Sequence, residues 1–243
     1  MHAKLSPNGI TAVLFDLDGT LRHNQPSSNQ TFFNYAAQLG AVDTPERRRN
    51  ALRWVHYYWA QSDDLMQDME TYGGLSEAFW IYYSYRTLIN FACPETQAQA
   101  LGPQVRQRML DEYQPVDMVA ADVWETLKAL CAAGFPLGVV SNRRNSYADQ
   151  MIALGLQPFF QFALAAGEVS SWKPEPGIFL HAVERLGAQP GRTIYVGDNY
   201  FSDIIGATNA GLRPVLLDPE GLFPEAECPV ITSLGGLLEV LSC

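Results

Sequence analysis

Residues 15–21 read Phe15-Asp16-Leu17-Asp18-Gly19-Thr20-Leu21 and follow directly on the apolar run Ile10-Thr11-Ala12-Val13-Leu14. The apolar run predicts a buried strand over residues 10–16. Carboxylates two residues apart on an extended chain point to opposite faces. Gly19 and Thr20 break that extended geometry, so the chain can turn and bring Asp16 and Asp18 to one site. One carboxylate can then act as a nucleophile while the other moves protons, although a simple acidic turn has the same residues.

Length, composition and charge narrow the class of protein. The chain has 243 residues, of which 47% are hydrophobic, and this suits one large domain or a core with a smaller inserted domain. The formal net charge of -10 argues against nucleic acid and anionic membranes as partners, because both attract basic surfaces. A phosphate site would need local positive groups, and a divalent cation would meet that need.

The cysteines and the apolar segments indicate a compartment. The four cysteines lie far apart without a CxxC pair, so we expect neither a disulfide scaffold nor a zinc site, and a reducing cytoplasm is the simplest compartment. Residues 1–9 contain no apolar core of signal-peptide length. No stretch approaches the roughly 20 apolar residues of a membrane span. We therefore expect a soluble, cytoplasmic protein, and the sequence leaves its oligomeric state open.

Two parts of the chain have different periodicities. Between about residues 29 and 112, apolar residues recur at helical spacing. After Pro115, helical segments alternate with short apolar runs. The predicted strands of this part cover residues 135–140, 193–196, 214–217 and 229–231. Such alternation is typical of parallel βαβ units. We predict an α/β fold with a Rossmann-like parallel sheet and helices on both faces, formed by residues 1–21 and 116–243, with a helical insertion at residues 22–115.

Polar residues follow three of the predicted strands directly. Asp16, Ser141 and Asp198 each lie just past an apolar run. In open α/β sheets the ligand binds at the carboxyl ends of the strands, so we predict that these residues share one site. Taken singly, Ser141 could be a turn residue or a helix cap, and Gly197-Asp198 could be a simple turn.

These residue types suit phosphoryl transfer, which needs a nucleophile, a proton donor, a fixed cation and hydrogen-bond donors for the phosphoryl oxygens. Ser141 offers a hydroxyl and a following loop of backbone N–H groups. Lys173 offers an ammonium on the proline-stiffened loop Ser171-Trp172-Lys173-Pro174-Glu175-Pro176, unless it is a solvated surface lysine. Asp198 and Asp203 can join Asp16 in holding Mg²⁺. Asp203 also begins a predicted helix, so it could instead be an N-cap.

The order of these residues resembles the four motifs of the haloacid dehalogenase-like hydrolase superfamily. The matching positions are Asp16 with Asp18, Ser141, Lys173, and Asp198 with Asp203. The resemblance covers residues 10–21 and about 116–243, and it implies that Asp16 attacks phosphorus while Asp18 serves as general acid and base. The Mg²⁺ ligands that it implies are the carboxylates of Asp16 and Asp198 and the backbone carbonyl of Asp18. The residues that would hold the phosphoryl oxygens are Ser141, Asn142 and Lys173, and those in supporting roles are Asp203 and Thr20.

The helical insertion is similar to the C1 cap of that superfamily, which covers the site and selects the leaving group. Its aromatic residues have a helical spacing that mostly indicates the core of a small bundle. Arg22 and His23 could reach an anionic substrate or belong to a surface hinge, and Arg86 is a further candidate for substrate contact.

The resemblance implies a Mg²⁺-dependent phosphatase that acts on a small phosphorylated metabolite through a phospho-Asp16 intermediate. A phosphosugar mutase has similar motifs and is the first alternative. A non-catalytic binding module with the same fold is the alternative from another class. The dehalogenases of this fold generally lack a second acidic residue in the first motif, so the presence of Asp18 disfavours that activity.

Overall fold

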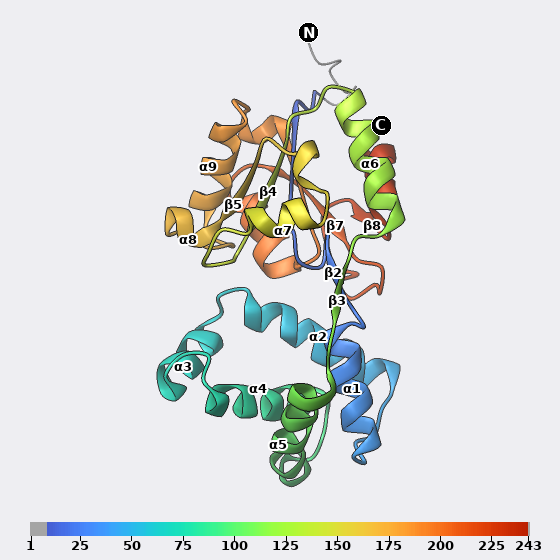
Figure 1. Ribbon diagram of the computed structural model, residues 1–243, viewed down its shortest axis with the longest axis vertical. Helices are drawn as coiled ribbons and strands as arrows, with labels where there is room; N and C mark the ends of the chain where they lie inside the picture. Colours follow the sequence, from blue (N-terminus) through green and yellow to red (C-terminus); the bar gives the residue numbers. More distant parts are fainter. Residues whose placement is uncertain (1–8, 243) are drawn as a thin grey trace. The chain divides into compact units, whose positions relative to one another are not determined.

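The computed structural model describes residues 9–242, and the contacts of the chain divide them into two units. One unit extends to His23 and resumes at Met118, and the other is Asn24–Asp117 (Figure 1). The expectation that the first residues hold no signal peptide concerns residues 1–8, which lie outside the described part. No helix among residues 9–242 combines the length and apolarity needed to cross a lipid bilayer.

Within residues 9–242, the first unit contains a six-stranded parallel sheet in the order β5-β4-β1-β6-β7-β8. Its strands are β1 (Ala12–Phe15), β4 (Leu137–Ser141), β5 (Phe162–Ala165), β6 (Thr193–Gly197), β7 (Arg213–Leu217) and β8 (Val230–Ile231). The predicted parallel α/β sheet is confirmed. Strand β1 pairs with β4 on one side and β6 on the other, so the motif that begins at Asp16 directly follows a central strand of the sheet.

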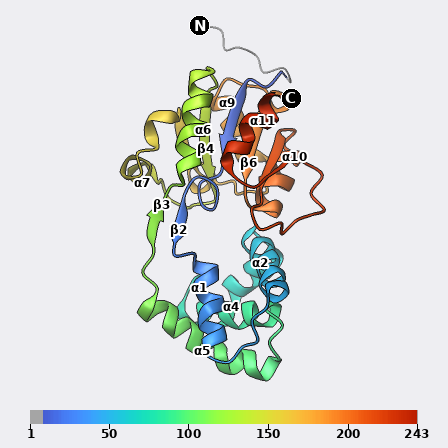
Figure 2. The same cartoon turned by 90° about the vertical axis from the view of Figure 1, so that its right-hand side faces the viewer.

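Helices cover both faces of this sheet because alternate strand residues pack in opposite directions. Phe15 packs with the helices α6 (Ala121–Ala132), α7 (Ala148–Ala153) and α11 (Leu237–Ser242). Leu14 packs on the other face with α9 (Pro176–Arg185) and α10 (Gly206–Asn209). In Figure 1, α9 and α6 lie on opposite sides of the strands, and Figure 2 shows the same unit from the side of α6 and α11. The short helices between these elements are η1 (Gln157–Phe159), α8 (Ala166–Val169), η2 (Pro190–Arg192), η3 (Tyr200–Ile205) and η4 (Leu234–Gly236).

The second unit is helical, as the periodicity of residues 29–112 predicts. Its helices are α1 (Ser28–Gln38), α2 (Pro45–Trp59), α3 (Asp63–Tyr72), α4 (Glu77–Asn90) and α5 (Glu95–Glu112). Four of them begin at a hydroxyl N-cap, and the capping residues are Ser27, Thr44, Ser62 and Ser76. Tyr58 and Phe79 are fully buried in an aromatic cluster with Trp54 and Trp59, so the aromatic spacing does mark a core.

A two-stranded ribbon, β2 (His23–Gln25) with β3 (Val116–Met118), lies where the chain enters and leaves the helical insertion. The sequence gives no signal for it, because each strand has three residues and those of β3 are all exposed. The ribbon pairs the first residues of the insertion with its last ones. The sheet therefore receives a long insertion whose two ends are hydrogen-bonded neighbours.

Candidate active site

The turn after β1 brings two acidic motifs together. Gly19 has a φ of +97°, in the left-handed region that favours glycine. A Cβ at Gly19 would overlap the Asp198 side chain, whose Cγ would lie 2.6 Å away. The Gly19 N–H donates to the Arg22 carbonyl at 2.8 Å and closes the turn. The predicted break of the extended chain is confirmed, and the close approach of Asp198 explains why it occurs at a glycine.

We expect the Gly19→Ala variant to lose more stability than the Gly40→Ala variant. Gly40 is the matched control, because its φ is +99° and a Cβ there would meet no atom within 4 Å. Both variants carry the strain of a left-handed alanine, about 1–2 kcal/mol, but only Gly19→Ala must also displace the Asp198 carboxylate. Urea denaturation of both variants measures the difference in the free energy of unfolding. Equal losses would contradict the close packing of Gly19 on Asp198.

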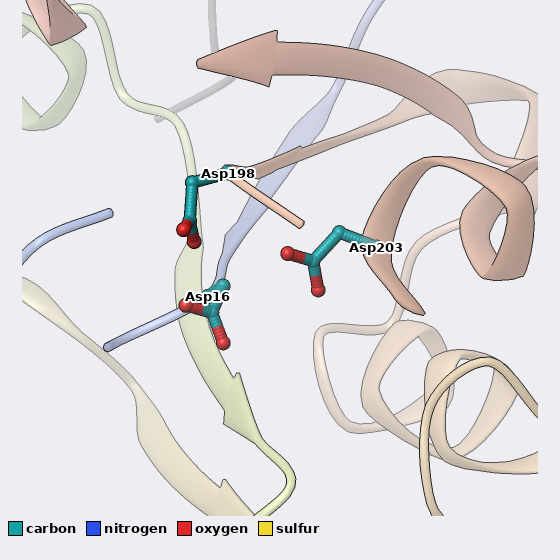
Figure 3. A group of neighbouring side chains, drawn as sticks. All are labelled: Asp16, Asp198 and Asp203. Carbon is teal, nitrogen blue, oxygen red and sulfur yellow. The ribbon is translucent and has the colours of Figure 1, made fainter. Parts of the chain in front are cut away.

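Three carboxylates meet at the carboxyl ends of β1 and β6. Asp16 follows β1, Asp198 follows β6, and Asp203 lies in η3; one oxygen of each lies within 4.8 Å of the others (Figure 3). In Figure 3 the three side chains point toward a common space. Asp16 Oδ2 is buried and has no hydrogen-bond partner among the described residues. Oxygen ligands with an unsatisfied buried carboxylate atom are the donor set that Mg²⁺ prefers, so these residues fit that ion.

Lys173 is the cation of this cluster. Its Nζ donates to Asp16 Oδ1 at 2.6 Å and to Asp203 Oδ1 at 2.6 Å, and the side chain is 3% exposed. It also donates to the Tyr195 hydroxyl at 3.0 Å. Burial alone would lower the pKa of Lys173, but the charges of Asp16 and Asp203 outweigh it and raise that pKa well above its usual value. Lys173 is therefore a buried, charged residue of the site and not a solvated surface lysine.

One ammonium does not neutralise three carboxylates. Burial raises the pKa of Asp16 to about 7, against the opposing charge of Lys173 and with the support of the charges of Asp203 and Asp18. Burial, with the charges of Asp16 and Asp203, also raises the pKa of Asp198 well above its usual value. Without a further cation, the cluster therefore resists carrying its full negative charge. A divalent cation would offset that charge.

The second predicted motif lies beside this cluster. Ser141 is the last residue of β4 and is buried, next in the sheet to the strand that carries Asp16. The Asn142 amide binds the backbone of Lys173 twice, donating to its carbonyl at 2.8 Å and accepting from its N–H at 2.6 Å. The Asn142 side chain thus orders the Lys173 loop, and its backbone N–H is the group left for an anion.

The structure corrects the interpretation of Asp203 as the start of a helix. The N-cap of η3 is Asn199, whose Oδ1 accepts from the backbone N–H groups of Phe201 and Ser202 at 3.0 Å each. Asp203 lies in the middle of this π-helical segment, buried, with Oδ2 accepting from the Asn199 N–H at 3.0 Å. The side chain therefore binds two groups, Lys173 through Oδ1 and the N–H of the N-cap residue Asn199 through Oδ2. Single π-helical turns of this kind are frequent at functional sites.

Thr20 and Tyr195 support the cluster. The Thr20 hydroxyl donates to Asp198 Oδ1 at 3.2 Å, so it contacts the acidic cluster. Tyr195 is absent from the sequence-based site because it reads as one more apolar residue of a buried strand. Its hydroxyl accepts from Lys173 and lies 3.3 Å from the Val140 carbonyl, to which it donates. A tyrosine in a buried strand needs such partners for its hydroxyl. The presence of Tyr195 in an apolar strand therefore indicated that polar groups lie nearby.

Asp18 is paired with two arginines. Arg143 donates to both carboxylate oxygens at 2.8 Å, and Arg22 donates to Oδ1 at 2.9 Å. Arg22 was a candidate for substrate contact or for a hinge, and the structure places it on Asp18. Arg143 is missing from the sequence-based site, although its place directly after Ser141 and Asn142 puts it at the carboxyl end of β4.

Arg86, another candidate for substrate contact, is part of a polar network inside the helical unit. It donates to Asp64 Oδ2 at 2.5 Å and to Asp68 Oδ2 at 2.8 Å, and Asp68 Oδ2 also accepts from the Tyr58 hydroxyl. Its guanidinium lies 5.5 Å from the centre of the Trp54 ring. These contacts join α2, α3 and α4, so they give Arg86 a structural role in this unit.

Comparisons with known proteins agree with this arrangement. A family model described as haloacid dehalogenase-like hydrolase matches residues 10–211. The chain is 31% identical to a glyceraldehyde 3-phosphate phosphatase of Methanopyrus kandleri over 85% of this chain and 83% of that protein. It is 26% identical to the pyrophosphatase PpaX of Bacillus pumilus over 98% and 99% of the two chains.

Among solved structures, the 2-haloacid dehalogenase of Pseudomonas syringae superposes with a TM-score of 0.54 and is 26% identical, with 96% of this chain and 98% of that chain covered. This dehalogenase therefore shares the fold of the present chain over most of its length. The family model spans the stretch from the first strand through Asp16, Lys173 and Asp203. With the acidic cluster built on those same strand ends, the chain belongs to the haloacid dehalogenase-like hydrolase family.

Proposed function

We propose that this hydrolase is a Mg²⁺-dependent phosphatase that acts on a small phosphorylated metabolite. The observation that carries the proposal is the state of Asp16: Lys173 binds one carboxylate oxygen, and the other is buried without a hydrogen-bond donor. An oxygen in that state is available to a cation or to a phosphorus atom. The names of the two curated relatives, a glyceraldehyde 3-phosphate phosphatase and a pyrophosphatase, support a small phosphorylated substrate.

Each residue of the site has a role in this reaction. Asp16 attacks phosphorus, the bond to the leaving oxygen breaks, and Asp18 gives that oxygen its proton. Asp18 then removes a proton from water, and the water oxygen attacks phosphorus and releases phosphate from Asp16. Lys173, the Ser141 hydroxyl and the Asn142 N–H hold the phosphoryl oxygens.

The Asp16 and Asp198 carboxylates and the Asp18 backbone carbonyl would hold Mg²⁺, which when bound neutralises charge on the phosphoryl group. Asp203 has both oxygens engaged, one by Lys173 and one by the Asn199 N–H. We therefore assign Asp203 a positioning role, toward Lys173 and the neighbouring ligands. We also assign residues 24–117 the role of the cap that selects the leaving group.

A turnover assay tests this function. Purified protein is offered p-nitrophenyl phosphate, phosphorylated sugars, short phosphorylated acids and nucleotides, each with Mg²⁺ or with a chelator. We expect phosphate release that the chelator abolishes. Release of product only in the presence of a sugar bisphosphate would indicate a mutase, and halide release from a 2-haloacid without Mg²⁺ would indicate a dehalogenase. No turnover of any of these substrates would favour a binding module.

The Asp18→Asn variant should affect substrates according to their leaving groups. A sugar phosphate has a poor leaving group that needs a proton, and general acid catalysis is worth roughly 10²–10⁴-fold in rate. p-Nitrophenyl phosphate needs little protonation, so its kcat should fall less. Steady-state kinetics on both substrates measures the two losses. The comparison applies where the absence of a product burst shows that phosphoryl transfer to Asp16 limits the rate. Equal losses of kcat on both substrates would then contradict general acid catalysis by Asp18.

A further inference from the structure

The Asp18 carboxylate is held by a fork of hydrogen bonds. Arg143 Nε donates to Oδ2 at 2.8 Å, and Nη2 of the same guanidinium donates to Oδ1 at 2.8 Å. A planar guanidinium that binds both oxygens of a carboxylate fixes its orientation as well as its position. The Asp18 side chain is 37% exposed, so the atoms packed around it restrain it only in part.

Arg143 is itself fixed by the helix and the strand that follow it. Its Nη1 donates to Gln150 Oε1 in α7, and its guanidinium carbon lies 5.4 Å from the centre of the Tyr147 ring. Tyr147 is buried, and its hydroxyl donates to the Leu164 carbonyl of β5 at 3.1 Å. The fork therefore connects the loop of Asp18 to a rigid part of the sheet and its helices.

The second arginine at Asp18 comes from the same turn as Asp18 itself. Arg22 lies four residues after Asp18, donates with Nη1 to Oδ1 at 2.9 Å, and belongs to the same turn. A contact inside one turn moves with that turn. Arg143 comes from the end of β4 and is the residue that relates Asp18 to the frame of the sheet.

We propose that Arg143 is a positioning residue for Asp18. It orients the Asp18 side chain: protonated Asp18 gives its proton to the leaving oxygen, and the carboxylate that results, which the fork binds through both oxygens, later takes a proton from water. This role rests on the phosphatase function proposed above, and it deepens that function by naming a residue outside the predicted set. Arg143 acts through Asp18 and makes no bond to the reacting phosphorus.

A double-mutant cycle tests this role, because residues that act as a unit give non-additive losses. The four proteins are the natural enzyme, Arg143→Ala, Asp18→Asn and the double variant, assayed with a sugar phosphate and with p-nitrophenyl phosphate. Arg143→Ala should lower kcat on the sugar phosphate by about 10–100-fold, the range found for residues that orient a functional group. Its KM should change by less than about twofold. As with Asp18→Asn, its kcat should fall less on p-nitrophenyl phosphate than on the sugar phosphate.

In the Asp18→Asn background, Arg143→Ala should cost less than about twofold, because the carboxylate that it positions is already gone. Arg143→Lys keeps the charge and most of the side-chain length, so it guards against misfolding. It should recover only part of kcat, because an ammonium cannot form the two parallel bonds of the fork. The control is Arg144→Ala, since Arg144 is exposed and makes no hydrogen bond or ion pair with its side chain among residues 9–242. We expect that variant to keep the natural kcat.

Different outcomes overturn different claims. Additive losses in the double variant would show that Arg143 acts independently of Asp18. A raised KM with an unchanged kcat would show that Arg143 binds the substrate and does not position Asp18. Full recovery by Arg143→Lys would show that charge alone suffices, and it too would overturn the proposal. If the natural enzyme releases no phosphate from any substrate, the proposed function fails and this role with it, whereas turnover by the natural enzyme with any of the first three outcomes overturns the role alone.

Discussion

Replacement of Asp16 by asparagine is expected to lower kcat by at least ~10³-fold, which corresponds to about 4 kcal/mol of activation free energy. Asparagine keeps the shape of the side chain but lacks the anionic oxygen that attacks phosphorus. It also removes the charge that faces Lys173 at 2.6 Å and the buried Oδ2 that a cation would engage. One substitution therefore affects both the nucleophile and the metal site.

The measurement is phosphate release by Asp16→Asn at saturating substrate and Mg²⁺, with circular dichroism to verify folding. Asp149→Asn is the matched control, because Asp149 is an exposed residue in the first turn of α7 within the same unit. We expect the control to keep the natural turnover. Retention of more than a tenth of the natural kcat by Asp16→Asn would exclude Asp16 as the nucleophile.

The second large effect is expected for Asp198→Ala. Removal of a residue that contacts a metal ligand typically lowers metal affinity or activity by about 10–100-fold. Removal of a direct ligand should lower activity further, and added Mg²⁺ should not restore the activity of that variant. Asp203→Ala should be partly rescued, because both Asp203 oxygens are engaged by Lys173 and by the Asn199 N–H. Rates measured against Mg²⁺ concentration separate the two variants.

Thermal stability gives a readout of the same site that does not depend on turnover. A ligand that binds the folded state stabilises it by about 2.7 kcal/mol at 100 times its dissociation constant. Mg²⁺ should therefore raise the Tm of the natural protein and leave that of Asp198→Ala unchanged. If Asp198→Ala responds to Mg²⁺ like the natural protein, by rate and by Tm, Asp198 is not a ligand.

The sheet and most of the site could be predicted from the sequence because both depend on local patterns. Buried parallel strands read as apolar runs, and the polar residues that follow them lie at one edge of the sheet. Strand β5 escaped prediction because its sequence, Phe162-Ala163-Leu164-Ala165, contains no β-branched residue. The ribbon of β2 and β3 is too short for any period to be visible.

Contacts made by long side chains could not be predicted in the same way. Arg143 and Asp18 are 125 residues apart, and their fork depends on how the end of β4 lies against the turn after β1. The inward direction of Asp203 depends on a π-helical turn and on buried Lys173, neither of which follows from residues 198–203 alone. Local sequence patterns determine the element on which such a residue lies, and tertiary packing determines which groups its side chain contacts.

The central place of β1 in the sheet has a consequence for biosynthesis. Asp16 leaves the ribosome before its partner Lys173, which follows 157 residues later. At 5–20 residues per second, this interval lasts roughly eight to thirty seconds. Strand β1, which lies in the middle of the sheet, has no neighbouring strand until β4 is made, and it lacks β6 throughout this interval. Nascent chains stalled before β4 should therefore hold an unpaired β1, recruit chaperones and lack all turnover.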